Sequence, residues 1–362
     1  MNFAIVRYLI GWMLGIESIF LLLPALTAVI YGEAELPAYL TAAAISLAGA
    51  ALLCHRKPKN TRFYAREGYV TVALCWLVLA VIGALPFVLS REIPFFIDAL
   101  FETVSGFTTT GATILGDVEA LSHASMLWRC LTHWVGGMGV LVFMLIVLPL
   151  AGGQTIFLMR AESPGPAVSK MSPHMRDTAT ILYAIYFGLT VLQMILLLIG
   201  GMPLFDAICV SLGTAGTGGF GNWNDSIAHY NSAYLQNVIT VFMILFGINF
   251  SAYFLILTRK FRQAFRIEEI RVYLGVIFVF AGLIAFNVRP MFGSLRESFH
   301  HALFQVASII TTTGFSTVDF DRWPTFSRAL LVLLMFIGAC AGSTGGGIKC
   351  SRILLLGKSV KK

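Results

Sequence analysis

Long apolar stretches alternate with short polar segments along most of the 362-residue chain. The stretches cover residues 8–30, 39–54, 69–89, 126–150, 181–199, 234–257, 272–286 and 329–356. Most are long enough to cross the hydrocarbon core of a bilayer, which takes about 20 helical residues. The pattern therefore predicts an all-α polytopic membrane protein. Its first stretch is predicted to be a retained helix and not a signal peptide, because it is longer than the apolar part of a signal and contains Glu17 and Pro24.

Composition and charge agree with a membrane location. Hydrophobic residues make up 57% of the chain and charged residues 12%, too few to cover a water-soluble fold. Of the 25 Lys and Arg residues, 19 fall at Arg7 and in segments 56–66, 160–176, 259–271 and 349–362. The positive-inside rule places these segments and the N-terminus in the cytoplasm. The net charge of +7 then follows from topology and contact with anionic lipids, and requires no nucleic acid.

Three polar segments inside this apolar sequence repeat one another. Residues 107–113 and 310–316 contain the sequence Thr-Thr-Thr-Gly, and residues 216–221 contain Gly-Thr-Gly-Gly. When Gly111, Gly219 and Gly314 are aligned, Thr109, Thr217 and Thr312 coincide two residues earlier, and Ala99, Ala207 and Ala302 twelve residues earlier. About ten residues lie between these anchors, too few for a span and enough for a re-entrant half-helix. A unit of about 100 residues is therefore repeated.

These segments have the composition of an ion filter. Irregular backbone at membrane depth must be buried in protein or line a watery cavity. Carbonyl groups from several such loops can replace the hydration shell of a cation, and glycine allows the backbone to turn them toward one axis. The predicted filter residues are Thr109, Thr110, Gly111, Thr217, Gly218, Gly219, Thr312, Thr313 and Gly314. The glycines of the second segment predict modest selectivity for potassium over sodium. The alternative is a packing face of small residues between helices.

An interruption in the last apolar stretch is the second candidate site. Residues 342–347 contain four glycines, which cannot hold a stable helix at the membrane centre. A phosphate-binding loop is excluded, because Ile348 separates Gly347 from Lys349 and Cys350 replaces the required hydroxyl residue. Lys349 either tethers this segment or repels a cation, or it is an anchor that reaches the interface. The candidate gating residues are Gly342, Ser343, Thr344, Gly345, Gly346, Gly347 and Lys349.

Other polar residues within or near the predicted spans are Glu17, Arg129, His133 and Asn249. An ionisable group in a membrane is a functional hypothesis by default. Arg129 and His133 are four residues apart near the outer end of their span, which favours interfacial anchoring. The six cysteines have no pairing or metal spacing and are interpreted as inert core thiols. Catalytic motifs are absent from the sequence, so the chain is not expected to be an enzyme.

These segments together resemble the TrkH family of bacterial potassium-uptake proteins, in a superfamily that includes the fungal and plant Trk and HKT transporters. The resemblance rests on the three Thr/Gly segments, on 136–139 and 160–166, and on 342–349. It implies helix–pore-loop–helix repeats around a central pore, an intramembrane gating loop, a homodimer in the inner membrane and a TrkA-type cytoplasmic nucleotide-binding regulatory subunit. Potassium is the transported ion in this family, no cofactor is covalently bound, and nucleotide acts only through the partner.

The domain organisation expected from the repeats has four parts. Residues 1–67 form an N-terminal transmembrane hairpin, 68–176 the first pore repeat, 177–268 the second, and 269–362 a third, incomplete repeat. The family has four repeats, so a C-terminal truncation is expected, with the fourth repeat absent. The predicted function is potassium uptake across the inner membrane. The alternatives are a non-conducting fragment that acts as a dimerisation or regulatory scaffold, and a membrane-embedded enzyme.

Overall fold

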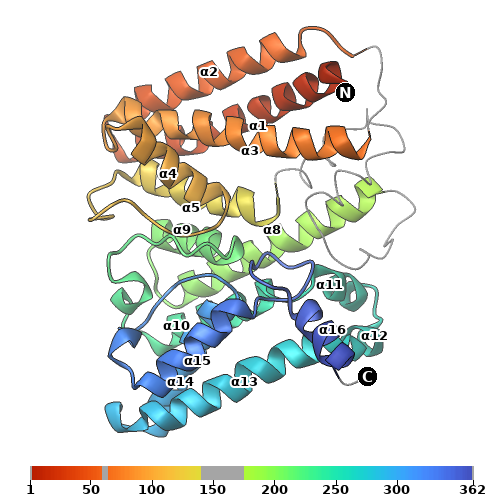
Figure 1. Ribbon diagram of the computed structural model, residues 1–362. Helices are drawn as coiled ribbons and strands as arrows, with labels where there is room; N and C mark the ends of the chain where they lie inside the picture. Colours follow the sequence, from red (N-terminus) through yellow and green to blue (C-terminus); the bar gives the residue numbers. More distant parts are fainter. Residues whose placement is uncertain (1, 59–63, 140–174, 361–362) are drawn as a thin grey trace. The chain divides into compact units, whose positions relative to one another are not determined.

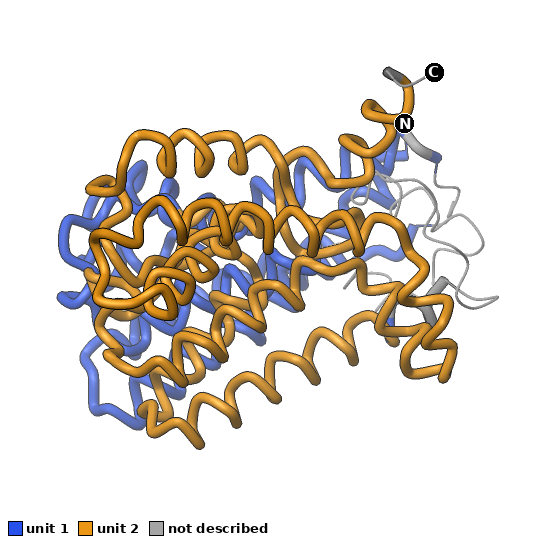
Figure 2. Tube along the Cα trace, turned by 90° about the horizontal axis from the view of Figure 1, so that it is seen from below, with its two compact units in different colours: residues 1–108, 112–165, 172–180 blue, residues 109–111, 166–171, 181–362 orange. Residues whose placement is uncertain are grey.

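The computed structural model describes residues 2–58, 64–139 and 175–360. Within these ranges the chain is helical, and the one β-type contact is an isolated bridge between Ile337 and Ile348. Two compact units are present (Figure 2). Of the described residues, unit 1 contains those up to Thr108, 112–139 and 175–180, and unit 2 contains Thr109–Gly111 and the chain from Ile181 onward. The motif at 160–166 lies outside the described residues.

Unit 1 consists mainly of α1 (Phe3–Tyr31), α2 (Leu36–Cys54), α3 (Ala65–Ser90), α4 (Phe96–Phe107) and α5 (His123–Gly137) (Figure 1). Helices α1 and α2 form the predicted hairpin and lie close together because small residues face one another. A Cβ added to Gly11 would lie 2.6 Å from the Cys54 sulfur. Hydroxyl groups connect the helices in both directions: Ser18 donates to the Ala43 carbonyl at 3.0 Å, and Ser46 to the Leu14 carbonyl at 2.8 Å.

Unit 2 contains most of α8 (Met175–Ile199) and all later helices. These are α9 (Leu204–Ala215), α10 (Ala233–Phe246), α11 (Phe250–Leu257), α12 (Phe261–Arg266), α13 (Glu268–Val288), α14 (Leu295–Ile310), α15 (Thr325–Phe336) and α16 (Cys350–Val360), with short 3₁₀ turns at Ser226–His229, Arg289–Met291 and Phe320–Arg322. The core lies between α13 and α14, where Tyr273, Ile277 and Ile284 pack in one buried cluster with Val306 and Ile310. Their helical spacing fixes which faces of the two helices meet.

Five of the eight predicted apolar stretches are spanning helices, one differs, the last is treated below with its interruption, and the stretch 126–150 lies partly outside the described residues. Among the described residues, five helices are long and apolar enough to cross a membrane: α1, α2 and α13, and the greater parts of α3 and α8. The stretch 234–257, predicted as one helix, is instead broken between α10 and α11, whose axes differ by 94°. Gly247 lies at the break, where a Cβ would be 2.2 Å from the Tyr273 hydroxyl. The Asn249 side chain then caps α11 by accepting from the Ser251 N–H at 2.8 Å.

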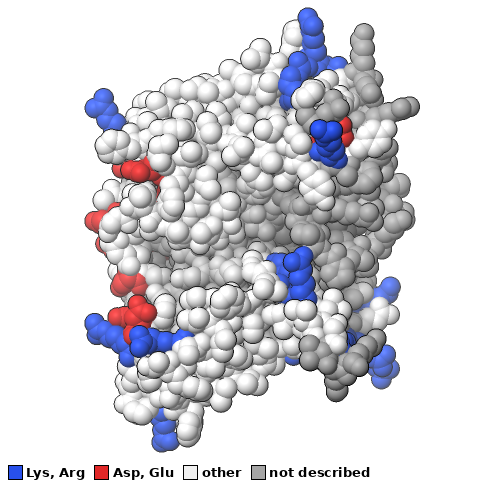
Figure 3. All heavy atoms as spheres, in the orientation of Figure 1, with Lys and Arg blue, Asp and Glu red and all other residues white. Residues whose placement is uncertain are grey.

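The helix surfaces have the distribution of charge expected for a bilayer. On the face shown in Figure 3, Lys, Arg, Asp and Glu form separate small groups, and most of the surface between these groups is uncharged. Large apolar side chains, such as those of Leu22, Leu77, Phe278 and Leu333, are exposed on the outer surfaces of the helices. Exposed apolar residues over the length of a helix indicate contact with lipid. The chain is therefore a multi-pass membrane protein.

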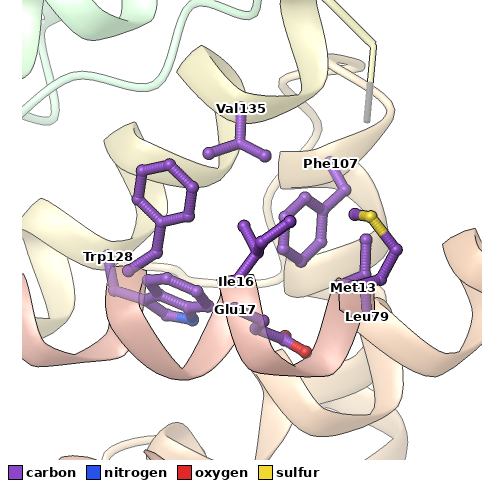
Figure 4. Close-up of a pocket in the computed structure, with 8 residues that line it drawn as sticks. Met13, Ile16, Glu17, Leu79, Phe107, Trp128 and Val135 are labelled. Atoms are coloured by element: carbon purple, nitrogen blue, oxygen red, sulfur yellow. The ribbon is translucent and has the colours of Figure 1, made fainter. Parts of the chain in front are cut away.

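Glu17 is a buried carboxyl inside unit 1. Only 2% of the residue is exposed, and neither carboxyl oxygen has a hydrogen-bond partner among the described residues. It borders a cavity of about 10 Å³, the size of a single water molecule. The other residues that line this cavity are Met13, Ile16, Phe20, Leu79, Phe107, Trp128 and Val135 (Figure 4). The cavity is thus an apolar enclosure around one acid group.

Candidate ion-conduction site

Each predicted filter segment begins directly after a short helix. Helix α4 covers residues 96–107, and α9 and α14 end at Ala215 and Ile310. At about 1.5 Å per residue, the twelve residues of α4 and of α9 reach only about 18 Å, half of the way across a bilayer and its interfaces. The half-helices predicted from the repeated anchors are therefore confirmed as helices.

The ends of α9 and α14 have the same hydrogen-bond pattern. The Thr217 N–H donates to the Thr214 carbonyl at 3.0 Å and the Gly218 N–H to the Gly213 carbonyl at 3.1 Å. In α14 the Thr312 N–H donates to the Ile309 carbonyl at 3.0 Å, and the Thr313 N–H to the Ser308 carbonyl at 2.9 Å. This is a Schellman motif, in which the first residue after the cap is left-handed and is usually glycine. Here that residue is threonine in both segments.

The backbone of the three segments, residues 109–111, 217–219 and 312–314, is unusual in the same way. Thr109, Thr217 and Thr312 have φ values of 54°, 53° and 59°, and the glycines two residues later have 75°, 81° and 88°. A left-handed conformation costs a β-branched residue roughly 1–3 kcal/mol, and such strain gathers at functional sites. Left-handed residues at alternate positions turn successive carbonyl groups toward the same side, whereas a β-strand points them to opposite sides.

The three segments lie against one another in chain order within unit 2. A Cβ added to Gly111 would lie 2.0 Å from the Gly218 carbonyl oxygen, and one added to Gly219 would lie 1.9 Å from the Thr313 carbonyl oxygen. The same position in the third segment, Gly314, has no atom of the described residues within 4 Å. The first two glycines are therefore required both by their φ values and by a neighbouring carbonyl.

Serine hydroxyls hold the chain that leaves two of the segments. Ser308 donates to the Phe315 carbonyl at 2.6 Å, and Ser105 donates to the Ala112 carbonyl at 2.5 Å. Both serines stand six residues before the aligned glycine. In the second repeat this position is Gly213, where a Cβ would lie 2.7 Å from the Phe220 carbonyl. The chain after the second segment therefore runs closer to its half-helix, and no serine hydroxyl holds it there.

Each half-helix is also joined to the chain beyond its segment by a different polar contact. In unit 1, Glu102 accepts from the Thr113 hydroxyl at 3.0 Å and from the Arg129 Nε at 2.7 Å. In unit 2, Asp206 accepts from Asn222 at 2.7 Å and from the Tyr230 hydroxyl at 2.6 Å. Burial and this bond to Asp206 raise the pKa of Tyr230 well above its usual value. In the third repeat, His301 pairs with the Thr317 hydroxyl at 2.9 Å.

The structure corrects the interpretation of Arg129 as an interfacial anchor. Its side chain is 1% exposed and forms an ion pair with Glu102, whose side chain is fully buried. Arg129→Met is expected to lower the free energy of unfolding by about 3–5 kcal/mol, because it leaves a buried carboxylate without its counter-charge. Arg322→Met removes an exposed pair with Asp319 and should cost less than about 1 kcal/mol.

Denaturant unfolding of the purified protein in detergent measures both changes. A loss at Arg129 as small as the loss at Arg322 would contradict this account. Adding Glu102→Gln to Arg129→Met removes the unpaired charge and should recover part of the lost stability.

The predicted interruption in the last apolar stretch is confirmed and is longer than residues 342–347. Helix α15 ends at Phe336 and α16 begins at Cys350, so residues 337–349, here called the Gly-rich loop, are not helical. The Gly346 N–H donates to the Thr312 hydroxyl at 2.8 Å, which joins the loop to the third filter segment. Lys349 donates to the Gly345 carbonyl within the same loop.

The opposite side of the loop is attached to the break between α10 and α11. The Cys340 N–H donates to the Gly247 carbonyl at 3.0 Å, and the Phe250 N–H donates to the Gly342 carbonyl at 2.9 Å. The Thr344 hydroxyl donates to the Phe246 carbonyl at 3.2 Å. The freed carbonyl groups of one broken helix thus bind the freed N–H groups of the other, as irregular backbone at membrane depth requires.

A cavity of about 180 Å³ opens beside the third segment. It is lined by Ser308, Ile309, Thr312, Gly314 and Met335. Thr312 therefore faces both this space and the Gly-rich loop. The cavity is large enough for several water molecules or a partly hydrated ion.

The sequence predicted the three Thr/Gly segments and the interruption at 342–347, but it did not indicate most of the residues that support them. The structure brings residues 109–111, 217–219 and 312–314 together in unit 2 and places the loop beside Thr312. Ser105 and Ser308 could have been found, because both occupy the same position in the repeat alignment. Asp206, Tyr230 and Glu269 gave no such indication. His133 is buried in α5, and Gly136 packs on the Phe107 carbonyl.

Comparisons with known proteins agree with this architecture. The family model described as "TrkH: Cation transport protein" matches residues 38–362. The Trk system potassium uptake protein TrkH of Salmonella typhimurium is 38% identical over 365 residues, which cover 99% of this chain and 75% of that protein. The Trk system potassium uptake protein TrkG of Escherichia coli K12 is 34% identical over 362 residues, with the same coverage.

A solved structure is similar over the whole chain. The crystal structure of the potassium transporter TrkH from Vibrio parahaemolyticus has a TM-score of 0.87 and 31% identity, and the match covers 100% of this chain and 76% of that one. Similarity of both sequence and fold over this length is specific to a family, and the repeated half-helices and left-handed threonines lie inside the matched region. The chain belongs to the TrkH family of cation transport proteins.

Proposed function

We propose that this protein takes up potassium across the bacterial inner membrane through a filter of backbone carbonyl groups. The relatives it matches are named potassium uptake proteins. The observation that carries the proposal is the shared left-handed conformation of Thr109, Thr217 and Thr312 in three segments that pack in chain order. Strain repeated three times at equivalent positions is retained only where a function needs that backbone.

The proposed path begins on the periplasmic side. Ions lose water to the carbonyl groups of residues 109–111, 217–219 and 312–314, and leave past the Gly-rich loop. The membrane potential drives entry with about 2.3 kcal/mol per charge per 100 mV. Gly218 stands where the other segments have Thr110 and Thr313, which gives that segment more backbone freedom. Selectivity for potassium over sodium is therefore modest.

The Gly-rich loop is the proposed gate. Its bond to Thr312 supports a position directly beneath the filter. From the sequence, Lys349 is expected to tether the loop, to repel a cation or to anchor at the interface. The bond from its ammonium group to the Gly345 carbonyl favours a tether that keeps the loop folded on itself. The gate responds to a TrkA-type cytoplasmic nucleotide-binding subunit, and the protein works as a homodimer; both assignments rest on the family alone.

Rubidium uptake tests the function. Expression in bacterial cells that lack their own potassium-uptake systems should restore growth at low potassium and produce rubidium uptake that potassium suppresses strongly and sodium suppresses to a smaller degree. Protein that reaches the membrane intact but gives no uptake, with its cytoplasmic partner present, would contradict conduction. That result would favour the scaffold function.

The proposed topology places the N-terminus and the loop after α2 in the cytoplasm and the residues after each filter segment in the periplasm. On a background without cysteines, Lys57→Cys and Asn224→Cys occupy exposed positions in the two regions. A membrane-impermeant maleimide added to whole cells should label Asn224→Cys only, and should label Lys57→Cys after the cells are opened. Labelling of both from outside would contradict the orientation.

A further inference from the structure

Glu269 is the second residue of α13, and its carboxylate is turned into the protein. The residue is 9% exposed, whereas its neighbour Glu268 pairs with Lys358 at the surface. One carboxylate oxygen of Glu269 accepts two backbone hydrogen bonds, from the Ala341 N–H at 2.7 Å and from the Ser351 N–H at 3.0 Å. The donors are ten residues apart in sequence and 72 and 82 residues away from Glu269.

The two donors flank the glycines of the Gly-rich loop. Ala341 directly precedes Gly342, and Ser351 lies in the first turn of α16, where N–H groups have no partner within the helix. The two ends of the loop also bind each other. The Gly338 N–H donates to the Ile348 carbonyl at 2.8 Å, and the Cys350 N–H donates to the Ala339 carbonyl at 3.1 Å. The Glu269 oxygen extends this short ladder by one further step.

The carboxylate is the one acidic group bound to this ladder among the described residues. Hydrogen bonds from backbone N–H groups to an ionised acceptor are stronger than those between neutral groups. A negative charge is also favoured at the start of α16 by the helix dipole. Glu269 therefore closes the base of a segment that has four glycines, and so few side chains, between the two donors.

We propose that Glu269 is a positioning residue for the gate: its carboxylate joins the two ends of the Gly-rich loop and thereby holds the loop against Thr312. The assignment of the loop as a gate rests on the function proposed above, but the joining of its ends does not. Loss of the carboxylate removes the last step of this ladder and weakens the joint between the two ends, so the loop leaves its place beneath the filter more often. The rest of unit 2 keeps its packing.

Native cysteines provide a direct test. Cys340 and Cys350 lie beside the two donors and are buried in the core cluster around α13, and Cys209 is buried in α9 of unit 2. Labelling of the full-length protein with N-ethylmaleimide, followed by peptide mass spectrometry, measures the exposure of each thiol. In Glu269→Ala the labelling rate of Cys340 and Cys350 should rise at least about tenfold, the effect of losing a single bond to a charged acceptor, while Cys209 stays unreactive.

Two further variants separate this role from general stability. Glu269→Gln keeps an acceptor oxygen without the charge and should give labelling between wild type and Glu269→Ala. Glu268→Ala removes the adjacent, exposed carboxylate and should change nothing. Unchanged labelling of Cys340 in Glu269→Ala would overturn the proposal, and so would equal labelling of Cys209, because the residue would then support the whole unit.

Measurements of ion flux separate the role of Glu269 in holding the loop from the role of the loop as a gate. In liposomes, Glu269→Ala should raise basal rubidium flux while the preference for potassium over sodium stays the same, because the filter segments are untouched. If the thiols become reactive and flux does not change, Glu269 still holds the loop and the loop is not the gate. If neither changes, the inference about Glu269 is wrong whatever the function of the loop.

Discussion

Gly219→Ala is expected to abolish selective potassium uptake while the protein still reaches the membrane. The new Cβ would lie 1.9 Å from the Thr313 carbonyl oxygen, a contact that forces two filter segments apart. The φ of 81° adds a cost of about 1–2 kcal/mol, which alone is a factor of about ten in the population of the correct backbone. Gly111→Ala should behave in the same way, because its Cβ would meet the Gly218 carbonyl oxygen at 2.0 Å.

Rubidium uptake in cells without other potassium systems measures the loss, and competition by sodium measures selectivity. Gly275→Ala is the matched control: it makes the same change in α13, where φ is not positive and a Cβ meets nothing within 4 Å. It should leave uptake unchanged. Normal selectivity in Gly219→Ala, in protein of normal abundance, would show that the glycines only pack helices together, the alternative that the sequence left open.

Deletion of residues 343–346 is expected to raise basal flux through the intact protein by about ten- to a thousandfold. A gate that is closed at rest keeps its open state at about 0.1–10% of the population, and removal of the obstruction makes that state dominant. The deletion also removes the Gly346 N–H that binds Thr312 and the Gly345 carbonyl that binds Lys349. Dependence on the cytoplasmic partner should weaken at the same time.

Thr312→Val provides a graded comparison for the deletion. It keeps the shape of the side chain and removes the hydroxyl that accepts from Gly346. Flux in liposomes should rise less than in the deletion, with the loop still present. Unchanged basal flux after the deletion, in protein whose filter remains selective, would contradict the gate and leave the loop as a structural joint between α15 and α16.

The sequence by itself determined the membrane class, most of the spans and the positions of the half-helices. These follow from local chemistry: apolar length predicts a span, and the repeated anchors at Ala99, Ala207 and Ala302 mark elements of one kind. The glycines at 342–347 likewise predict an interruption wherever they stand in an apolar helix. None of these conclusions requires knowledge of which helices touch.

The tertiary structure decided everything that depends on contacts between distant residues. A membrane helix that is apolar on all sides carries no pattern to show which face meets a neighbour. The pairing of Arg129 with Glu102 and the break at Gly247 beside the Tyr273 hydroxyl are therefore invisible in sequence. The same holds for the carboxylate of Glu269, whose donors lie more than seventy residues away.

The proposed filter depends partly on sequence and partly on tertiary structure. The sequence predicted which residues form it, because Thr and Gly in a repeated polar segment are unusual among apolar helices. It could not show that Thr109, Thr217 and Thr312 are left-handed, since threonine on its own avoids that conformation. Only the packed half-helices and the neighbouring segments hold these residues there, which is why the backbone of the proposed filter depends on tertiary structure.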